Sequence, residues 1–454
     1  MTQENTVSVP GRLSLSPLVQ MRRLRDGLAA RPFLRNVSIM LSGAAGGQLI
    51  SLLLAPVLTR LYSPQQFGIL SVYLAALTML TVIASLRYEL ALPLVRRQGD
   101  AINLTFVCLC VLTATTTLLG VAVFTVPDVM VHDLWPVPLE GGQLTLYRWL
   151  FIIGYACLGG YYIALQLATR AGDFPAIAKT RLAQGLVGPG SQIGLALVGA
   201  ATPGLLAGSV LGQSAGTLGL FGTVLNRRRL RLLSWRRMRM LANRYIRFPL
   251  IASWAALIDA AGSSQLLYLL VGLFYSPYIA GFIFLVERVV SRPLAIVGTS
   301  ILQVYIGEAG KIAATDPARL MRRFRQVVSR QFMLALAWAV AANIAATFFF
   351  AAVFGPEWQD GVLYLRAMSI GYLAQALVQP VFHTLQLLEK QAMAAGWQVG
   401  RLCLTVAVFM GGYGLGLEPH WVITGYSAAQ AVCCLALLGL MARAIGQRQK
   451  GFEG

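Results

Sequence analysis

Long apolar segments alternate with short polar connections along nearly the whole chain. A helix needs about 20 apolar residues to cross the hydrocarbon core of a bilayer, and segments of that length recur about twelve times. Helical spans are expected at residues 36–59, 68–86, 104–126, 146–168, 183–201, 204–225, 249–273, 278–306, 330–354, 362–385, 393–416 and 421–442. The pattern predicts an all-α polytopic membrane protein with about twelve transmembrane helices.

The composition excludes an ordinary soluble protein. Hydrophobic residues make up 57% of the chain and charged residues only 12%, whereas about a quarter of the residues in globular domains are charged. The net charge of +20 raises nucleic acid as a partner. Most arginines lie between the apolar spans, however, where orientation in the membrane explains them. No nucleic-acid partner is therefore expected.

The cysteines and histidines give no pattern of metal ligands. All six cysteines lie within apolar spans and form no C-x-x-C pair, so neither a disulfide framework nor a zinc site is indicated. His132 and His420 fall in predicted external loops, and His383 lies at the inner end of the tenth span. Neither a metal ion nor any other cofactor is predicted.

Positive charges fall in every second connection, and lysine and arginine are enriched on the cytoplasmic side of membrane proteins. They lie at Arg96 and Arg97, from Arg170 to Arg181, from Arg227 to Arg247, from Lys311 to Arg330, at Lys390, and from Arg443 to Lys450. Both termini are therefore predicted to be cytoplasmic. The opposite connections are short, the longest being 127–145, and leave no room for an external catalytic domain. A transporter without catalytic residues is expected.

An arginine-rich stretch divides the chain into two halves. The predicted organisation is a cytoplasmic basic tail (1–35), an N-terminal six-helix lobe (36–225), an arginine-rich cytoplasmic linker (226–248), a C-terminal six-helix lobe (249–442) and a cytoplasmic tail (443–454). Orientation in the membrane and contact with anionic membrane lipids explain the linker better than a specific ligand does.

A short internal repeat supports this division. Tyr62-Ser63-Pro64 with Gly68 recurs at the same spacing as Tyr275-Ser276-Pro277 with Gly281, in the external turn after the first span of each half. Repeats in the same orientation are related by an axis along the membrane normal and leave a binding site at their interface. A central cavity between the two lobes is expected.

Four charged residues fall inside spans seven and eight, namely Asp259, Glu287, Arg288 and Arg292. Each costs about 2.5–3.5 kcal/mol at the bilayer centre, so such groups face a cavity or a partner. Arg288 and Arg292 are four residues apart and share one helix face, which favours an anionic ligand. An Asp259–Arg288 ion pair that holds two helices together is the alternative, and the sequence leaves it open.

Three further charges belong with this group. Arg401 falls near the middle of the eleventh span and joins the candidate cluster. Arg87 and Glu89 end the second span on the inner side, where a solvated gate and an interfacial anchor are equally good interpretations.

Several segments together resemble a known family. They are Leu58-Thr59-Arg60-Leu61-Tyr62-Ser63-Pro64-Gln65-Gln66-Phe67-Gly68, Arg87-Tyr88-Glu89-Leu90-Ala91-Leu92-Pro93, Glu287-Arg288 with Pro293 and Gln303-Val304-Tyr305, and Phe354-Gly355-Pro356-Glu357-Trp358. Over roughly residues 33–445 the chain is similar to the Wzx-type polysaccharide and O-antigen flippases of the multidrug/oligosaccharidyl-lipid/polysaccharide (MOP) exporter superfamily.

This resemblance implies two lobes of six helices around a basic central cavity, in a multi-pass protein of the bacterial inner membrane. The implied function is alternating-access transfer of an undecaprenyl-diphosphate-linked glycan to the periplasmic face, for O-antigen or exopolysaccharide biosynthesis. Polysaccharide polymerase and chain-length machinery are implied as further partners. By the repeat offset, the first-half counterparts of Asp259, Glu287 and Arg288 are the uncharged Gly46, Leu74 and Ala75. The positive charge of the cavity is therefore expected mainly from the second half and from Arg87.

On this hypothesis Arg288, Arg292, Arg401 and Arg87 bind the diphosphate or an acidic sugar, because guanidinium is permanently charged and offers paired donors to phosphate oxygens. The carboxylates Asp259, Glu287 and Glu89 are candidates for proton or sodium coupling or for ion pairs. Alternatives are a drug or cation antiporter of the same superfamily, a membrane glycosyltransferase or glycan polymerase, and a scaffold that recruits glycan enzymes.

Overall fold

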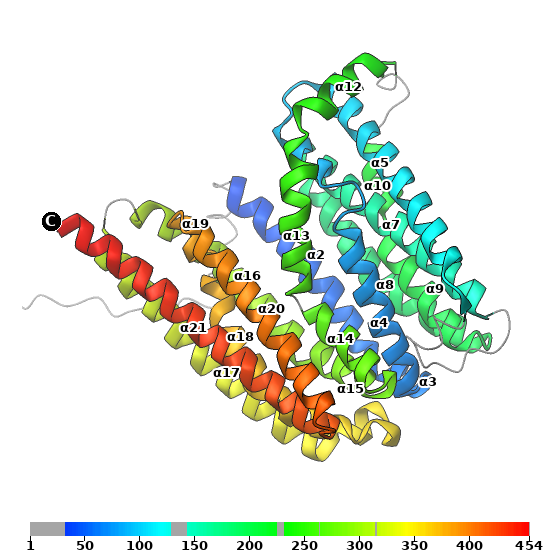
Figure 1. Ribbon diagram of the computed structural model, residues 1–454, viewed down its shortest axis with the longest axis vertical. Coiled ribbons are helices and arrows are strands. Elements are labelled where there is room, and N and C mark those ends of the chain that lie inside the picture. Colours follow the sequence, from blue (N-terminus) through cyan, green and yellow to red (C-terminus); the bar gives the residue numbers. More distant parts are fainter. Residues whose placement is uncertain (1–31, 129–142, 225–230, 263, 314–315, 454) are drawn as a thin grey trace, which may run out of the picture.

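The computed structural model describes residues 32–128, 143–224, 231–262, 264–313 and 316–453 (Figure 1). Three parts of the predictions lie outside the described residues: most of the basic tail, His132, and the first part of the arginine-rich linker up to residue 230. Each predicted span overlaps a helix or a series of consecutive helices, and the described part of the chain contains no strand. This confirms the predicted all-α fold.

The helices of the first half follow one another from α2 to α10. Their bounds are α2 (Pro32–Leu53), α3 (Ala55–Leu61), α4 (Pro64–Thr81), η1 (Tyr88–Leu94), α5 (Gln98–Thr125), α7 (Gln143–Ala171), α8 (Phe174–Leu197), α9 (Ala201–Ser214) and α10 (Thr217–Val224).

The second half begins after the arginine-rich segment. Its helices are α12 (Trp235–Arg244), η2 (Phe248–Ala252), α13 (Ser253–Ala261), α14 (Ser264–Phe274), α15 (Pro277–Val286), η3 (Glu287–Ser291), α16 (Arg292–Ile312), α17 (Pro317–Phe354), η4 (Pro356–Trp358), α18 (Gly361–Val378), η5 (Gln379–Val381), α19 (Thr384–Leu387), α20 (Gln391–Gly414) and α21 (Pro419–Glu453).

By length and composition, 8 helices of the described residues can cross a membrane, or up to 9 if the bent pair Phe248–Ala261 and Ser264–Phe274 is one span. The remaining predicted spans are α4, α8 and the pair α15 and α16. Helix α8 carries Lys179 and Arg181, and the π-helical turn η3 separates α15 from α16. Helix α4 has 18 residues and begins with Pro64-Gln65-Gln66. Each of these three spans is therefore short, polar in part, or interrupted.

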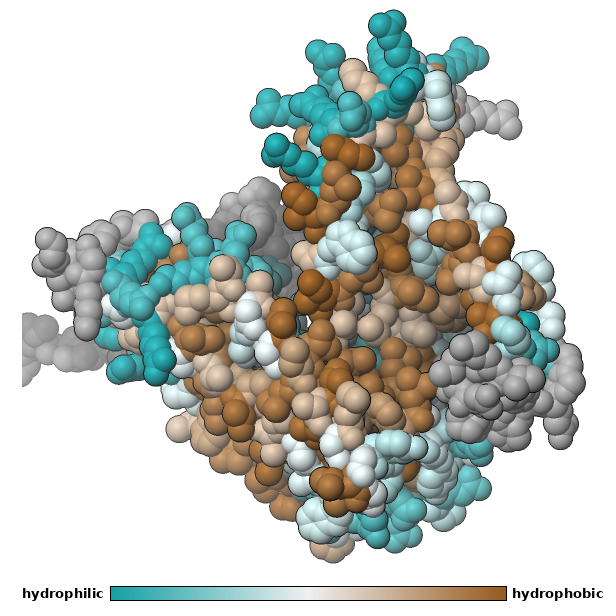
Figure 2. All heavy atoms as spheres, viewed as in Figure 1, coloured by the Kyte–Doolittle hydropathy of each residue, from teal (hydrophilic) through white to brown (hydrophobic). Residues whose placement is uncertain are grey.

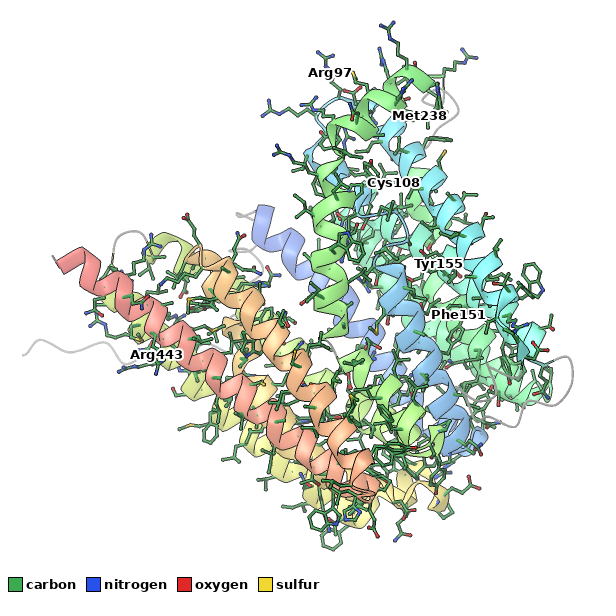
Figure 3. The ribbon with its side chains drawn as sticks, viewed as in Figure 1. Arg97, Cys108, Phe151, Tyr155, Met238 and Arg443 are labelled. Carbon is green, nitrogen blue, oxygen red and sulfur yellow. The ribbon has the colours of Figure 1, made fainter. Side chains whose placement is uncertain are left out.

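The helices form the two arms of a V (Figure 1). The arms meet at an apex near α3 and α15 and diverge toward α12 on one arm and α19 on the other. Large apolar side chains cover the flanks, while hydrophilic residues gather at the open end of each arm (Figure 2). Arg97 and Arg443 mark these two ends (Figure 3). The V opens on the side that the sequence predicts to be cytoplasmic.

The internal repeat forms the contact between the two arms at the apex. Ser63 caps α4 and Ser276 caps α15, each by accepting a hydrogen bond from the backbone three residues later. A Cβ on Gly68 would lie 1.6 Å from the carbonyl oxygen of Pro277, and a Cβ on Gly281 would lie 1.9 Å from that of Pro64. The two copies of the motif thus pack against each other, and each glycine allows the backbone of the other helix to approach.

Trp358 adds a second contact at the apex. Its side chain is fully buried, and its indole nitrogen donates a hydrogen bond to the carbonyl oxygen of Thr59 at 2.9 Å. The ring centroid lies 5.1 Å from that of Phe67 in the first half and 5.8 Å from that of Phe282 in the second. One indole therefore joins both arms on the side opposite to the opening.

Candidate functional site

A cavity of about 480 Å³ lies between the two arms. Helices α2, α8 and α9 form one wall, and α15, η3 and α16 form the other. The described lining contains three arginines and no carboxylate. Its charged and polar members are Arg181, Arg288, Arg292, Gln48, Gln184, Gln192, Gln213, Ser51 and Ser209. The inter-lobe cavity is therefore electropositive and rich in neutral hydrogen-bonding groups.

Arg288 connects the two walls of this cavity. It lies in the π-helical turn η3, is only 8% exposed, and donates from Nη2 to the backbone oxygen of Ser51 at 3.0 Å and to its Oγ at 2.5 Å. Ser51 belongs to α2 of the opposite arm. No carboxylate pairs with Arg288 among the described residues. A buried charge held only by neutral groups is costly, which favours binding of an anion there.

Arg292 lies one helical turn beyond Arg288 and lines the same cavity. It is half-buried and makes no hydrogen bond or ion pair with the described residues. The helical spacing therefore brings these two guanidinium groups together, as the sequence predicts for residues four apart. Their charges are available to a ligand.

Arg181 completes the positive lining, and sequence reasoning missed this role. It was assigned to a cytoplasmic connection because the fifth span was expected to start at residue 183. Helix α8 instead begins at Phe174, where Asp173 caps it by accepting a hydrogen bond from the Ala176 amide at 3.1 Å. Arg181 thus lies inside the helix, with its guanidinium 5.5 Å from the centroid of the Tyr161 ring. The Asp-Phe-Pro sequence at 173–175 is the signal that marks this earlier start.

Arg87 does not line the inter-lobe cavity. It has a left-handed backbone conformation with a φ of 61° at the start of η1, and its Nη1 lies 3.8 Å from Oε1 of Glu89. Glu89 is 6% exposed and accepts a hydrogen bond from the Ser85 hydroxyl. The two predicted residues therefore form a partly buried ion pair within the first arm.

Replacing Glu89 by leucine is expected to lower the stability of the protein by about 1.5–3 kcal/mol, because it leaves Ser85 without its acceptor and Arg87 without its counter-charge. Glu89→Gln keeps an acceptor for Ser85 and is expected to cost less. Thermal unfolding in detergent measures both effects. Glu308→Leu is the control, since the Glu308–Arg323 ion pair is partly exposed and contributes at most about 1 kcal/mol. Equal losses at positions 89 and 308 would contradict the interpretation.

Glu287 and Arg401 come together in a separate small cavity of about 30 Å³. Glu287 accepts hydrogen bonds from the Tyr268 hydroxyl at 2.5 Å and from the Ser264 hydroxyl at 3.3 Å. Its side chain points away from that of Arg288, as expected for neighbours about 100° apart on a helix. The carboxylate is thus held by neutral donors in a space large enough for water.

Arg401 holds the bend in the seventh span. The axes of Phe248–Ala261 and Ser264–Phe274 differ by 58°, and Arg401 donates a hydrogen bond to the Gly262 carbonyl oxygen at the end of the first segment. Its guanidinium also lies 4.9 Å from the centroid of the Trp397 ring. The structure therefore places Arg401 beside the break in the helix rather than in the arginine-lined cavity.

Asp259 lies in a third cavity, of about 530 Å³, between α13 and the helices α19 and α20. Its Oδ1 accepts a hydrogen bond from Nε2 of Gln398 at 2.5 Å. Arg288 is engaged with Ser51 instead. Asp259 and Arg288 therefore do not form the ion pair that the sequence left open as an alternative.

Comparison with known proteins establishes the fold and the family. Residues 57–363 match the family described as polysaccharide biosynthesis protein. An inward-facing multidrug resistance MATE family transporter of the MOP superfamily aligns with 91% of this chain and 96% of its own, at 14% identity and a TM-score of 0.62. An outward-facing MATE transporter of the same superfamily covers the same shares at 12% identity and a TM-score of 0.54.

The MATE multidrug transporter DinF-BH, in a complex with a ligand, aligns with 88% of this chain and 95% of its own, at 15% identity and a TM-score of 0.54. The curated proteins contain no significant match. At these identities the structural likeness defines the fold, whereas the family match extends over more than half of the sequence. The chain therefore belongs to the polysaccharide biosynthesis protein family and is a multi-pass membrane protein with the transporter fold of the MOP superfamily.

Proposed function

We propose that the protein is a flippase that moves a polyprenyl-diphosphate-linked oligosaccharide across the bacterial inner membrane. The observation that carries this proposal is the cavity between the arms, which has three arginines and no carboxylate in its described lining. Membership of the polysaccharide biosynthesis family supports a glycan as part of the cargo. The transporter fold supports movement of the cargo rather than its chemical conversion.

The diphosphate is assigned to Arg288, Arg292 and Arg181. Arg288 and Arg292 approach from the second arm and Arg181 from the first, so an anion between them is held by both arms. Guanidinium groups bind phosphate oxygens through paired donors and keep their charge at all physiological pH values. A cationic drug would meet only repulsion in this lining, which disfavours the alternative of a drug or cation antiporter.

Transport follows from rocking of the two arms about the apex. The open side of the V admits the diphosphate from the predicted cytoplasmic face, and the lipid tail stays in the bilayer. Separation of the Gly68–Pro277 and Gly281–Pro64 contacts then opens the other side. Glu287, within its small cavity, is proposed as the coupling group for a proton or sodium ion. Polymerase and chain-length proteins are proposed to receive the glycan after transfer.

Replacing Arg288 by methionine is expected to weaken binding of a labelled polyprenyl-diphosphate glycan by about 30-fold or more, because truncating one side of a buried charged hydrogen bond costs about 2 kcal/mol or more. The measurement is a binding titration with the purified protein in lipid nanodiscs. Arg288→Lys keeps the charge but loses the paired donors. Its affinity is expected to lie between those of the wild-type protein and Arg288→Met.

Arg366→Met is the matched control. Arg366 is exposed and donates to the Thr347 hydroxyl at 3.1 Å, away from the cavity. The proposed function would be overturned if Arg288→Met, at normal protein levels, bound the diphosphate glycan as tightly as the wild-type protein does. It would also be overturned if the wild-type protein bound a cationic dye instead of the glycan.

A further inference from the structure

The cavity around Asp259 has a different chemistry from the arginine-lined one. Its described lining shares no residue with the inter-lobe cavity and contains no lysine or arginine. It contains instead one carboxylate, one imidazole, several primary amides and two aromatic rings. The members used below are Asp259, His383, Gln386, Gln398, Phe382 and Trp397. The single negative charge and the absence of cations in this lining disfavour a phosphate.

These groups suit an uncharged sugar ring. A pyranose presents hydroxyls around its rim, each a donor and an acceptor, and apolar C–H groups on its faces. Carboxylate and amide side chains supply acceptors and donors for the rim, and an aromatic ring covers the apolar face. An organic cation would use Asp259 and an aromatic ring but would make no use of the amides, whereas sugar hydroxyls bond to both kinds of group.

The polar groups are held in place by hydrogen bonds and still have unpaired donor or acceptor atoms. Gln398 donates from Nε2 to Asp259 at 2.5 Å, while its Oε1 is buried and has no hydrogen-bond partner among the described residues. The His383 Nδ1 and Gln386 Oε1 atoms lie 2.7 Å apart, which orients both side chains. Asp259 is exposed, and its Oδ2 has no hydrogen-bond partner among the described residues, so this oxygen can accept from a sugar hydroxyl.

Trp397 is held just as firmly. Its indole nitrogen donates to the Cys433 carbonyl oxygen at 2.7 Å, and Arg401 lies over one face of the ring at 4.9 Å. The ring of Phe382 stands at 71° to it, with centroids 6.4 Å apart. Because the polar atom of the indole is already satisfied, the part of Trp397 that lines the cavity is apolar carbon.

The position of the cavity fits a cargo that enters through the open V. Helix α13, like α14 and α15 after it, contacts α4 of the first arm, and η2 before it contacts η1. The Asp259 cavity has α13 on one side and α19, α20 and α21 on the other. The hydrogen bond from Gln398 joins Asp259 of α13 to α20.

We propose that this cavity, with Asp259, Gln398 and Trp397 at its centre, binds uncharged sugar residues of the cargo. The inference rests on the proposed function, because the sugar site acts together with the diphosphate site in the inter-lobe cavity. The cargo is thus recognised at two separate subsites. The arginines bind the diphosphate, which all polyprenyl-diphosphate-linked glycans share, and the Asp259 cavity selects the glycan.

The test compares two kinds of ligand on the full-length protein in nanodiscs. The first is farnesyl diphosphate without a sugar, and the second is the same diphosphate linked to glucose, galactose or N-acetylglucosamine. Wild-type protein is expected to bind at least one sugar-bearing ligand about tenfold more tightly than the sugar-free one. A gain of this size corresponds to about one or two additional hydrogen bonds.

Asp259→Asn and Trp397→Ala are expected to remove this preference and to leave affinity for the sugar-free ligand unchanged, which also shows that the variants are folded. Gln386→Ala, at an exposed position, is expected to reduce the preference with the least effect on packing. Arg288→Met is expected to weaken both kinds of ligand equally.

The outcomes separate the two proposals. If Arg288→Met leaves both ligands unaffected, the proposed function is wrong. If it weakens both but no sugar improves wild-type binding, or the preference survives in Asp259→Asn and Trp397→Ala, the sugar site is wrong and the diphosphate site stands. Binding of ethidium that is lost in Asp259→Asn would identify the cavity as a site for organic cations and overturn the sugar assignment.

Discussion

Gly68→Ala is expected to lower the stability of the protein by about 3 kcal/mol or more, the upper range for overpacking. The added methyl carbon would lie 1.6 Å from the carbonyl oxygen of Pro277. That oxygen belongs to the backbone at the start of α15, so no side-chain rotation relieves the overlap and the two arms must move apart. Gly281→Ala is expected to have an equivalent effect because Pro64 meets it in the same way. Thermal unfolding in detergent and the yield of monodisperse protein measure the loss.

Gly160→Ala is the control for this prediction. Gly160 lies within α7, and a Cβ there would meet nothing within 4 Å. Glycine to alanine in a helix interior otherwise stabilises by up to about 1 kcal/mol, so the control is expected to be neutral or stabilising. If Gly68→Ala behaved like Gly160→Ala, the apex contact would not have the close packing described.

Trp358→Ala is expected to destabilise the protein by about 3–5 kcal/mol, the range for truncating a buried aromatic residue. The substitution removes the hydrogen bond to Thr59 and the ring contacts with Phe67 and Phe282, so the two arms lose a shared anchor. On the proposed function, the substitution also loosens the contact between the arms at the apex. A Phe67→Cys substitution would then react faster with a cysteine-specific probe when Trp358 is replaced by alanine.

Two variants make this measurement specific. Trp358→Phe keeps an aromatic ring but loses the hydrogen bond to Thr59. It is expected to lower the stability by about 1 kcal/mol. Trp421→Ala removes a tryptophan that is 61% exposed at the start of α21 and is expected to have little effect. A loss in Trp421→Ala as large as that in Trp358→Ala would show that Trp358 has no special part in joining the arms.

Local properties of the sequence were sufficient to predict the helices and part of the site. The length of each apolar segment determines whether it can span a membrane, and the helical period places Arg288 and Arg292 on one face. Both arginines line the inter-lobe cavity. The repeated Tyr-Ser-Pro motif predicted a cavity between the halves, but not the contact between its two copies at the apex.

The partners of the other charged residues were not predictable in this way. Arg401 was grouped with Arg288 because both lie within apolar spans, yet it binds the Gly262 carbonyl oxygen at a bend that hydropathy does not reveal. Arg87 pairs with Glu89 because a left-handed turn directs the chain into η1. Hydropathy places Arg181 in a connection because a charge near a helix start and a charge in a loop have the same hydropathy.

The sequence by itself determined the fold class and the presence of charges that need partners within the membrane. These depend on segment length and helical period, which are properties of neighbouring residues. Only the tertiary structure decided that Arg181 faces Arg288 and Arg292 across a cavity, that Asp259 joins Gln398, and that Gly68 and Gly281 pack against each other's helices. Each of these depends on close contact between helices distant in the sequence, and apolar spans can pack in many ways that have the same hydropathy pattern.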